Sequence, residues 1–433
     1  MFFCDKISSG EKSMKYYIYT LGCKVNSYES EVIAEHFNNA DFSLAGEPKD
    51  ANVIVVNTCT VTNQADSKSR KTIRQARREN PEACLIVCGC SAENHKESLI
   101  DLDIDILIGN KDKSLLVKYA LDFLKNKNKI EKFYDLRNVP FEEMSIKNFE
   151  GKTRGFVKIQ DGCNNFCSYC IIPFMRGNIR SKNIDVATEE INCLANNGYK
   201  EIVLTGIHTG SYGAGCDYRL VDLIRNISKN ENLERIRISS IEITELDEDF
   251  MEELKTNKKI VDHMHIPIQA GSDHVLEMMR RKYKLVDYIK KIDEIRTIRP
   301  EISITTDLIV GFPEETDEDF ENTLKVVEQI GFAKVHTFPY SMRTGTLAST
   351  FKQVNDTVKK NRTKQMLELS DVLENKYYKS FIGKELEVLV ENDNSGFTSN
   401  YIKVNLDQDI KPNTLVKVVI TEVDGLTVKG KVK

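Results

Sequence analysis

Three cysteines stand close together in the segment DGCNNFCSYC, residues 161–170. Cys163, Cys167 and Cys170 have C-x3-C-x2-C spacing on a predicted loop after a strand-like run. Three thiolates at this spacing can hold an iron–sulfur cubane and leave its fourth iron without a protein ligand. Such an open position lets a metal site chelate a substrate group. The alternative is structural zinc, but zinc prefers four ligands and no Cys or His follows within the next twenty residues.

Three further cysteines, Cys23, Cys59 and Cys90, each follow a different strand-like run. In a parallel sheet the carboxyl ends of the strands open into one crevice, where ligands bind. Cysteines meeting at that edge predict a second cluster with an open iron. The alternative is a set of buried free cysteines. Cys88 is the rival of Cys90, and we favour Cys90 because it lies past the end of its strand.

Alternating strand and helix patterns precede residue 126 and must position the second triplet. Strand patterns occupy 15–21, 52–57, 84–88 and 104–108, and helical patterns occupy 28–40, 66–79 and 114–125. Apolar runs separated by amphipathic helices indicate a parallel sheet of flavodoxin-like type. No G-x-G-x-x-G follows the first strand, so a dinucleotide site is not expected.

The alternation resumes after a charged, aperiodic segment at 126–152, which we interpret as a linker. Six further strand patterns predict a partial (β/α)6 barrel of TIM-like type, with its chemistry at the carboxyl ends of the strands. They lie at 155–160, 201–206, 234–240, 262–268, 302–310 and 333–338, and the helical patterns between them lie near 187–197, 219–229, 246–256, 285–297 and 317–330. Short β-patterned runs after 376 predict a small all-β barrel.

We therefore expect an N-terminal domain at 14–125, a barrel domain at 153–375 and a β domain at 376–433. Met14 is a candidate start, because the residues before it have no pattern. The chain has 11 cysteines and neither a signal peptide nor a long apolar run, so we expect a cytoplasmic protein whose thiols bind metal, without a membrane association. The net charge of −5 gives no general nucleic-acid signal.

Four signatures occur in order between residues 20 and 177: TLGCKVNSYE, NTC, GCSAE and CNNFCSYCIIPFMRG. Together they resemble the radical S-adenosylmethionine tRNA methylthiotransferases, and the first resembles the branch acting on N6-threonylcarbamoyladenosine. The likeness continues in LTGIHTGSYG, RISSIE, HIPIQAGSD, MRRKY, TTDLIVGFPEET and HTFPYSMRTGT. The last β segment resembles the RNA-binding TRAM domain. One departure follows Arg176-Gly177, where Asn178 and Ile179 replace part of the family's R-G-R-x-R-S.

The resemblance implies two [4Fe-4S] clusters. Cys163, Cys167 and Cys170 would hold the cluster that cleaves S-adenosylmethionine to a deoxyadenosyl radical. Cys23, Cys59 and Cys90 would hold an auxiliary cluster that supplies or carries sulfur. The product would be a methylthio group on the adenine C2 beside the anticodon of tRNA, an unpaired base of the kind that proteins can splay out. An electron donor such as a flavodoxin or ferredoxin, and a sulfur donor, would be partners.

Several residues near the predicted barrel strand ends are candidates for binding S-adenosylmethionine. The resemblance implies that Thr205 and Gly206 contact the methionyl amino group of S-adenosylmethionine, although an ordinary β/α turn would also explain these two residues. Tyr169 would pack against adenine or simply fill apolar space, and Glu242 would bind ribose or cap a helix. The set is Tyr169, Thr205, Gly206, Glu242, Gln269 and Asp307.

The helical segment DSKSRKTIRQARRE carries a basic stripe. Its arginines fall on one helix face at i, i+4, i+7 and i+8: Arg70, Arg74, Arg77 and Arg78. This face would bind RNA phosphate in a salt-sensitive way, or else is an ordinary solvated helix face.

Three alternatives remain open. Within the same chemistry, the substrate would be isopentenyladenosine in tRNA or an aspartate of a ribosomal protein. From another class, the chain would be a non-enzymatic iron–sulfur scaffold that binds RNA.

Overall fold

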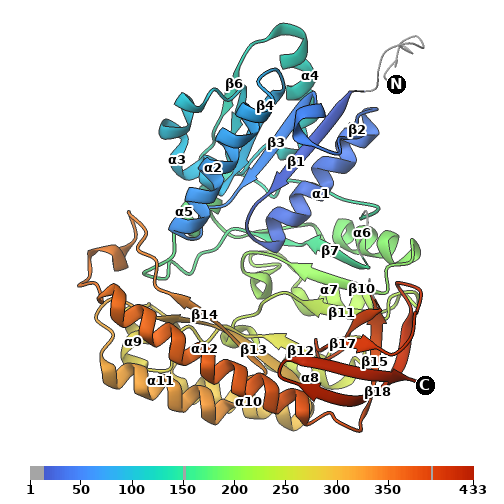
Figure 1. Ribbon diagram of the computed structural model, residues 1–433, viewed down its shortest axis with the longest axis vertical. Coiled ribbons are helices and arrows are strands. Elements are labelled where there is room, and N and C mark those ends of the chain that lie inside the picture. Colours follow the sequence, from blue (N-terminus) through green and yellow to red (C-terminus); the bar gives the residue numbers. More distant parts are fainter. Residues whose placement is uncertain (1–13, 150–152, 392–393) are drawn as a thin grey trace. The chain divides into compact units, whose positions relative to one another are not determined.

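The computed structural model describes residues 14–149, 153–391 and 394–433 (Figure 1). The chain divides into two compact units, residues 1–144 and 145–433. Cys4, the last three residues of the predicted linker and the start of the DNSG turn lie outside the described residues. Among the described helices, none combines the length and the apolar character needed to cross a membrane.

The first unit is built on a parallel sheet with strand order β2-β1-β3-β4-β5-β6, which confirms the flavodoxin-like prediction. The central strands are runs of Val, Ile and Leu that are buried on both faces, as strands covered by helices on both sides must be. The strands are β1 (Lys15–Thr20), β2 (Ser43–Leu44), β3 (Val53–Thr58), β4 (Cys84–Gly89), β5 (Ile106–Ile108) and β6 (Ile130–Lys132). Three residues of the predicted linker thus form β6 and extend the sheet.

Four helices accompany this sheet: α1 (Lys24–Asn39), α2 (Asn63–Glu79), α3 (Cys90–Leu99) and α4 (Leu116–Asn126). The predictions for α1, α2 and α4 are confirmed, although α1 begins four residues before the predicted 28. No predicted helical pattern covers α3. This helix is short and polar, and non-helical backbone at His95 interrupts it, so it carries little periodic signal.

The second unit contains the six predicted parallel strands as two three-stranded sheets, ordered β11-β10-β7 and β12-β13-β14. A parallel bridge between Ile236 and Ile260 links β11 to the residues before β12, which makes a partial barrel in chain order. The strands are β7 (Arg154–Lys158), β10 (Glu201–Thr205), β11 (Arg235–Ile238), β12 (His263–His265), β13 (Ser303–Val310) and β14 (Lys334–Pro339).

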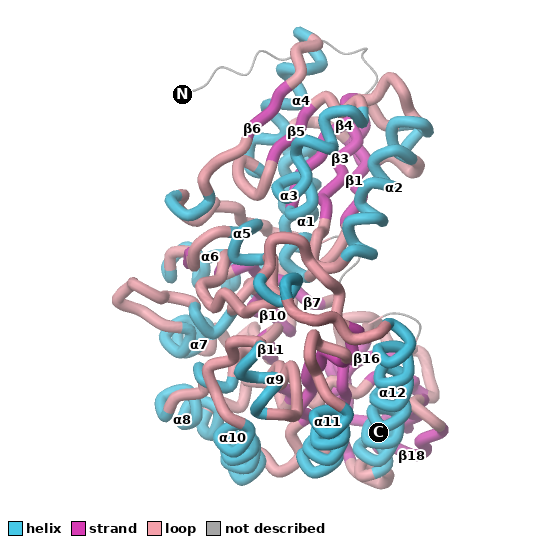
Figure 2. Tube along the Cα trace, turned by 90° about the vertical axis from the view of Figure 1, so that its left-hand side faces the viewer, coloured by secondary structure: helices cyan, strands magenta, loops and turns pink. Residues whose placement is uncertain are grey.

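Helices form an arc outside these strands (Figure 2). They are α6 (Ile184–Asn196), α7 (Leu220–Ile227), α8 (Glu248–Thr256), α10 (Leu285–Ile298), α11 (Asp317–Ile330) and α12 (Asp356–Lys379). Five of the six match predicted helical patterns, and α12 is additional. Two shorter helices, α5 (Ile172–Arg176) and α9 (Asp273–Met278), lie in loops that follow β8 (Gln160–Asp161) and β12.

The C-terminal strands close into a small barrel of order β15-β16-β17-β19-β18, as predicted. Its core is aliphatic and includes Val388, Val404, Val418 and Ile420. The strands are β15 (Glu385–Val390), β16 (Ser395–Thr398), β17 (Lys403–Leu406), β18 (Leu415–Asp424) and β19 (Thr427–Val432).

Arginines in the amino-terminal parts of β7 and β11 attach this small barrel to the partial barrel. Arg235 donates to the backbone oxygen of Phe397 over 2.9 Å. The guanidinium of Arg237 lies 4.6 Å from the ring centre of Tyr401, and that of Arg154 lies 4.9 Å from the ring centre of Phe397. These contacts are made at the end of the strands opposite to the one where chemistry is expected.

Candidate active site

The loop between β8 and α5 carries Cys163, Cys167 and Cys170. Backbone hydrogen bonds of 3.0 Å join Cys163 N to Gly177 O and Cys170 N to Cys167 O. Burial raises the pKa of the Cys167 thiol. Burial, reinforced by the neighbouring Cys167, raises the pKa of Cys170 to about 12. The three predicted thiols are therefore gathered on one loop, where burial favours the neutral form of Cys167 and Cys170 until a metal takes the place of the proton.

Two cationic side chains that the sequence analysis did not single out contact this loop. Burial lowers the pKa of His208, but hydrogen bonds with Cys163 and Glu245 outweigh it and raise the pKa to about 10. Arg281 donates to the sulfur of Cys167 over 3.5 Å and also contacts the carboxylate of Glu242. Both residues lie in motifs noted above, LTGIHTGSYG and MRRKY, which was the only signal that the sequence offered.

Thr205 and Gly206 lie together at the carboxyl end of β10, as predicted. Thr205 is fully buried, and its hydroxyl has no hydrogen-bond partner within the described residues. A Cβ at Gly206 would come within 2.8 Å of Gln160 Oε1. That oxygen already accepts a hydrogen bond of 2.7 Å from His208 N, so Gly206 leaves room for Gln160 to hold the loop.

The other cofactor candidates are less clearly gathered. The Tyr169 ring packs edge-on against Phe312, with ring centres 6.3 Å apart. Glu242 is engaged by Arg281 and caps the short helical turn that follows it. Asp307 lies within β13 rather than at its end, and its carboxylate is 3.4 Å from His265 Nε2. Gln269 is joined to it by a 2.9 Å hydrogen bond from Gln269 N to Asp307 O.

The second cysteine triplet lies at the carboxyl ends of three neighbouring strands. Cys23 follows β1 and precedes α1, Cys59 follows β3, and Cys90 is the first residue of α3 after β4. Cys59 and Cys90 are buried and Cys23 is exposed. A Cβ at Gly22 would lie 2.7 Å from the sulfur of Cys59, so the glycine lets the backbone beside Cys23 approach Cys59.

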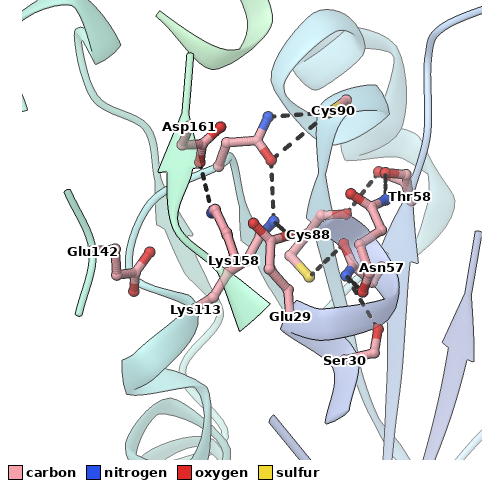
Figure 3. A network of polar contacts seen from close by, with 12 residues as sticks. Glu29, Ser30, Asn57, Thr58, Cys88, Cys90, Lys113, Glu142, Lys158 and Asp161 are labelled. Carbon is pink, nitrogen blue, oxygen red and sulfur yellow. Dashed lines mark hydrogen bonds and ion pairs between the residues drawn. The ribbon is translucent and has the colours of Figure 1, made fainter. Parts of the chain in front are cut away.

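The polar surroundings of Cys88 and Cys90 differ (Figure 3). Asn57 donates through Nδ2 to Asn26 O and to Ser30 Oγ, so its Oδ1 faces Cys88 Sγ at 3.8 Å. Cys88 is thus placed to donate, as a neutral thiol does. Cys90 Sγ instead receives a hydrogen bond of 3.5 Å from Asn110 Nδ2. An acceptor sulfur is what a thiolate ligand presents, and these contacts favour Cys90 over Cys88.

No group of three or more Cys, His, Asp or Glu side chains in the described residues is arranged to hold a single metal ion. A cubane needs ligands that are spread more widely, because each thiolate binds a different iron.

Known proteins resemble the chain over most of its length. It is 39% identical to the threonylcarbamoyladenosine tRNA methylthiotransferase MtaB of Bacillus subtilis over 89% of each chain. It is 36% identical to the MtaB of Aquifex aeolicus over 94% of this chain and all of the other. The chain belongs to the MtaB family of tRNA methylthiotransferases.

Two sequence families agree with this membership. Residues 15–109 match the "Uncharacterized protein family UPF0004", and residues 157–327 match the "Radical SAM superfamily". The MtaB-family chain is also 33% identical to a tRNA-2-methylthio-N(6)-dimethylallyladenosine synthase of Thermodesulfovibrio yellowstonii, over 97% of this chain and 99% of the other.

A solved structure shares the fold of this MtaB-family chain. It is the radical S-adenosylmethionine methyltransferase TsrM of Kitasatospora setae, with a TM-score of 0.56, 14% identity and coverage of 76% of this chain and 75% of that one. Membership of the radical SAM superfamily gives S-adenosylmethionine and [4Fe-4S] clusters as cofactors. The residues present fit them: six thiols lie in two triplets, and the buried Thr205 hydroxyl still lacks a partner among the described residues.

The basic stripe of this MtaB-family chain is only partly available to a ligand. Arg74 and Arg78 are exposed on α2, and Arg70 is half-buried. Arg77 instead donates to the backbone oxygens of Asp103 and Ala83, over 2.9 and 3.0 Å, and pairs with Asp105 at 2.6 Å. Its expected role in RNA binding is corrected accordingly, because these contacts occupy the guanidinium.

Proposed function

We propose that the protein adds a methylthio group to the adenine C2 of N6-threonylcarbamoyladenosine, next to the anticodon of tRNA. The proposal rests on two cysteine triplets, one at the carboxyl ends of β1, β3 and β4 and the other on the loop between β8 and α5, in a chain 39% identical to a curated enzyme of that name. Relatives named for the dimethylallyladenosine substrate are less similar, at 32–34% identity. That substrate is the second candidate.

In this proposal Cys163, Cys167 and Cys170 hold the cluster that binds S-adenosylmethionine, and Cys23, Cys59 and Cys90 hold the auxiliary cluster. When bound, these groups supply reductive cleavage of S-adenosylmethionine and a transferable sulfur. The Thr205 hydroxyl makes a hydrogen bond to S-adenosylmethionine. Gly206, which has no side chain, leaves the room that Gln160 needs beside it. The hydrogen bond of Arg281 to Cys167 holds one sulfur of the first triplet in position, and His208, paired with Glu245, places a positive charge beside the same loop.

The substrate and partners follow from the same proposal. Arg70, Arg74 and Arg78 bind tRNA phosphates, and the base enters the partial barrel from the carboxyl ends of the strands. Tyr169, Glu242, Gln269 and Asp307 remain candidates for cofactor contacts. A small redox protein of the flavodoxin or ferredoxin kind would supply electrons, and a separate donor would replace the sulfur. The enzyme would act in the cytoplasm, where its tRNA substrate is found.

Nucleoside mass spectrometry of tRNA from a deletion strain tests the substrate. We expect loss of the methylthio-threonylcarbamoyl nucleoside and its return when the intact gene is supplied. The variant with Cys23, Cys59 and Cys90 replaced by Ala serves as the control and should not restore it. Loss of only the methylthio-dimethylallyl nucleoside would transfer the assignment to the second candidate, and an unchanged tRNA profile would refute both. A reduced, iron-loaded protein that forms no 5′-deoxyadenosine would support the non-enzymatic scaffold.

A further inference from the structure

The motif after Cys23 places polar side chains in the interior of the first unit. Asn26 and Glu29 belong to the KVNSYE run, lie on α1 and are no more than 1% exposed. Asn26 Nδ2 donates to Leu21 O over 2.7 Å and to Thr58 O over 2.8 Å, which ties together the ends of β1 and β3. Buried polar groups in a helix are retained only where partners satisfy them, so the position of Glu29 requires a partner.

That partner is Lys113, which lies 84 residues further along the chain and contacts the Glu29 carboxylate (Figure 3). Both side chains are only 1% exposed. A buried ion pair needs further hydrogen bonds to offset the loss of water. Lys113 Nζ makes one of them to Asn110 Oδ1, at 3.1 Å.

The ion pair decides which way the Asn110 amide points. An ammonium group has donors only, so Asn110 must turn its oxygen toward Lys113. Its Nδ2 then faces Cys90 Sγ at 3.5 Å, whereas the oxygen is 3.9 Å from that sulfur. The backbone of Asn110 is also held, since its N–H donates to Glu93 Oε2 over 2.9 Å.

We propose that Glu29, Lys113 and Asn110 are positioning residues of the auxiliary cluster. This inference rests on the proposed function, because it takes Cys90 as a cluster ligand. The buried ion pair holds the amide so that its N–H faces the Cys90 sulfur. Hydrogen bonds to cluster sulfurs raise the reduction potential, since they favour the more negative, reduced form. Second-shell partners of this kind also slow the loss of metal.

Asn110→Asp removes the donor, because it keeps an oxygen for Lys113 and puts a carboxylate oxygen, which cannot donate, in place of the N–H that faces Cys90. It also adds a negative charge, so the double variant described next, which leaves the net charge unchanged, separates the lost hydrogen bond from the added charge. The variant is made in the full chain with Cys163, Cys167 and Cys170 changed to Ala, so that only the auxiliary cluster is observed. We expect a lower midpoint potential in an EPR-monitored titration and about 10-fold faster loss of iron to bathophenanthroline. Asn38→Asp is the control for the same substitution at an exposed position, since its oxygen accepts from Tyr16 Oη at 3.0 Å. Equal potentials and iron-loss rates in the two Asp variants would overturn the proposal.

A double variant, Glu29→Leu with Lys113→Met, tests the ion pair. Apolar replacement of a whole buried pair generally preserves folding, whereas removal of one partner does not. We expect the double variant to fold, as judged by circular dichroism, and to shift the potential and iron-loss rate in the same direction as Asn110→Asp. A potential equal to that of the parent would show that the ion pair does not orient the amide. If the parent, which carries only the three Cys→Ala changes, binds no iron, the assignment of Cys23, Cys59 and Cys90 as cluster ligands fails as well. If the parent binds iron but the variants behave like it, only the positioning role fails.

Discussion

Arg281 donates a hydrogen bond of 3.5 Å to the sulfur of Cys167, across 114 positions of the chain. The same guanidinium contacts Glu242, and the Arg281 side chain is only 4% exposed. The positive charge of Arg281 lowers the pKa of the Cys167 thiol and so opposes the larger rise that burial causes. The pair therefore connects the β12–β13 region of the partial barrel to the cluster loop.

Arg281→Gln should lower the rate of 5′-deoxyadenosine formation about 10- to 100-fold, because a second-shell partner of a ligand is lost. The rate is measured by chromatography after chemical reduction of the iron-loaded protein. Arg280→Gln is the control, since Arg280 is the exposed neighbour. Equal rates of 5′-deoxyadenosine formation in the two variants would show that Arg281 does not contribute to radical generation.

Cys90→Ser should reduce the iron content by about half, since two cubanes carry about four irons each. Cys88→Ser should retain nearly all of it, because Cys88 faces the acceptor oxygen of Asn57 while Cys90 faces a donor. Iron and sulfide are counted on anaerobically purified protein. The reverse pattern would make Cys88 the ligand.

Gly22→Ala should also remove the auxiliary cluster. Its Cβ would lie 2.7 Å from Cys59 Sγ, and the backbone φ of +99° disfavours any side chain. We expect the iron count to fall by about half, with 5′-deoxyadenosine still formed. Gly46→Ala is the matched control, since a Cβ there meets nothing within 4 Å. A full iron count in Gly22→Ala would mean that Cys59 can move without loss of the cluster.

Arg74→Ala and Arg78→Ala should each weaken tRNA binding and reduce its salt dependence by about one counterion. Arg77→Ala should instead destabilise the first unit, because its guanidinium holds the residues around Asp103 and Asp105. Filter binding at several salt concentrations and thermal melting separate the two effects. If Arg77→Ala alone weakened binding without lowering the melting temperature, the assignment would be inverted.

The stability contributed by Asp319 should depend on pH. Burial opposes its ionisation, but hydrogen bonds from Ser272, Thr316 and His274 outweigh this and lower its pKa to about 2. An unfolded Asp has a pKa near 3.9, so the contribution is complete above about pH 5 and is lost as the pH falls toward 2. Asp319→Asn should therefore lower the urea midpoint of the cluster-free protein at pH 7 and converge with the parent near pH 2. A constant difference across that range would contradict the assignment.

The places of the six cysteines in the fold were predictable because their signals are local, and their role as cluster ligands stays a prediction. Three lie within eight residues, and three follow apolar runs that must form neighbouring parallel strands. The partners of those cysteines were not predictable, since Arg281 and Asn110 reach Cys167 and Cys90 only through the folded topology. Helical periodicity placed Arg77 on the correct face of α2, but it does not reveal that the 103–105 segment packs against that face. The pairing of Glu29 with Lys113 was not predictable for the same reason, because the fold brings together residues that are far apart in the sequence.

The arginine contacts between the small C-terminal barrel and the amino ends of β7 and β11 have a mechanical consequence. Arg154, Arg235 and Arg237 anchor the barrel through the rings or backbone of Phe397 and Tyr401. The small barrel is therefore held in a fixed orientation against the partial barrel and is not a flexibly linked domain. An RNA bound to the small barrel would lie at a fixed distance from the cysteine loop, which is at the opposite end of the same strands. That distance would determine which nucleotide comes close to the cysteine loop.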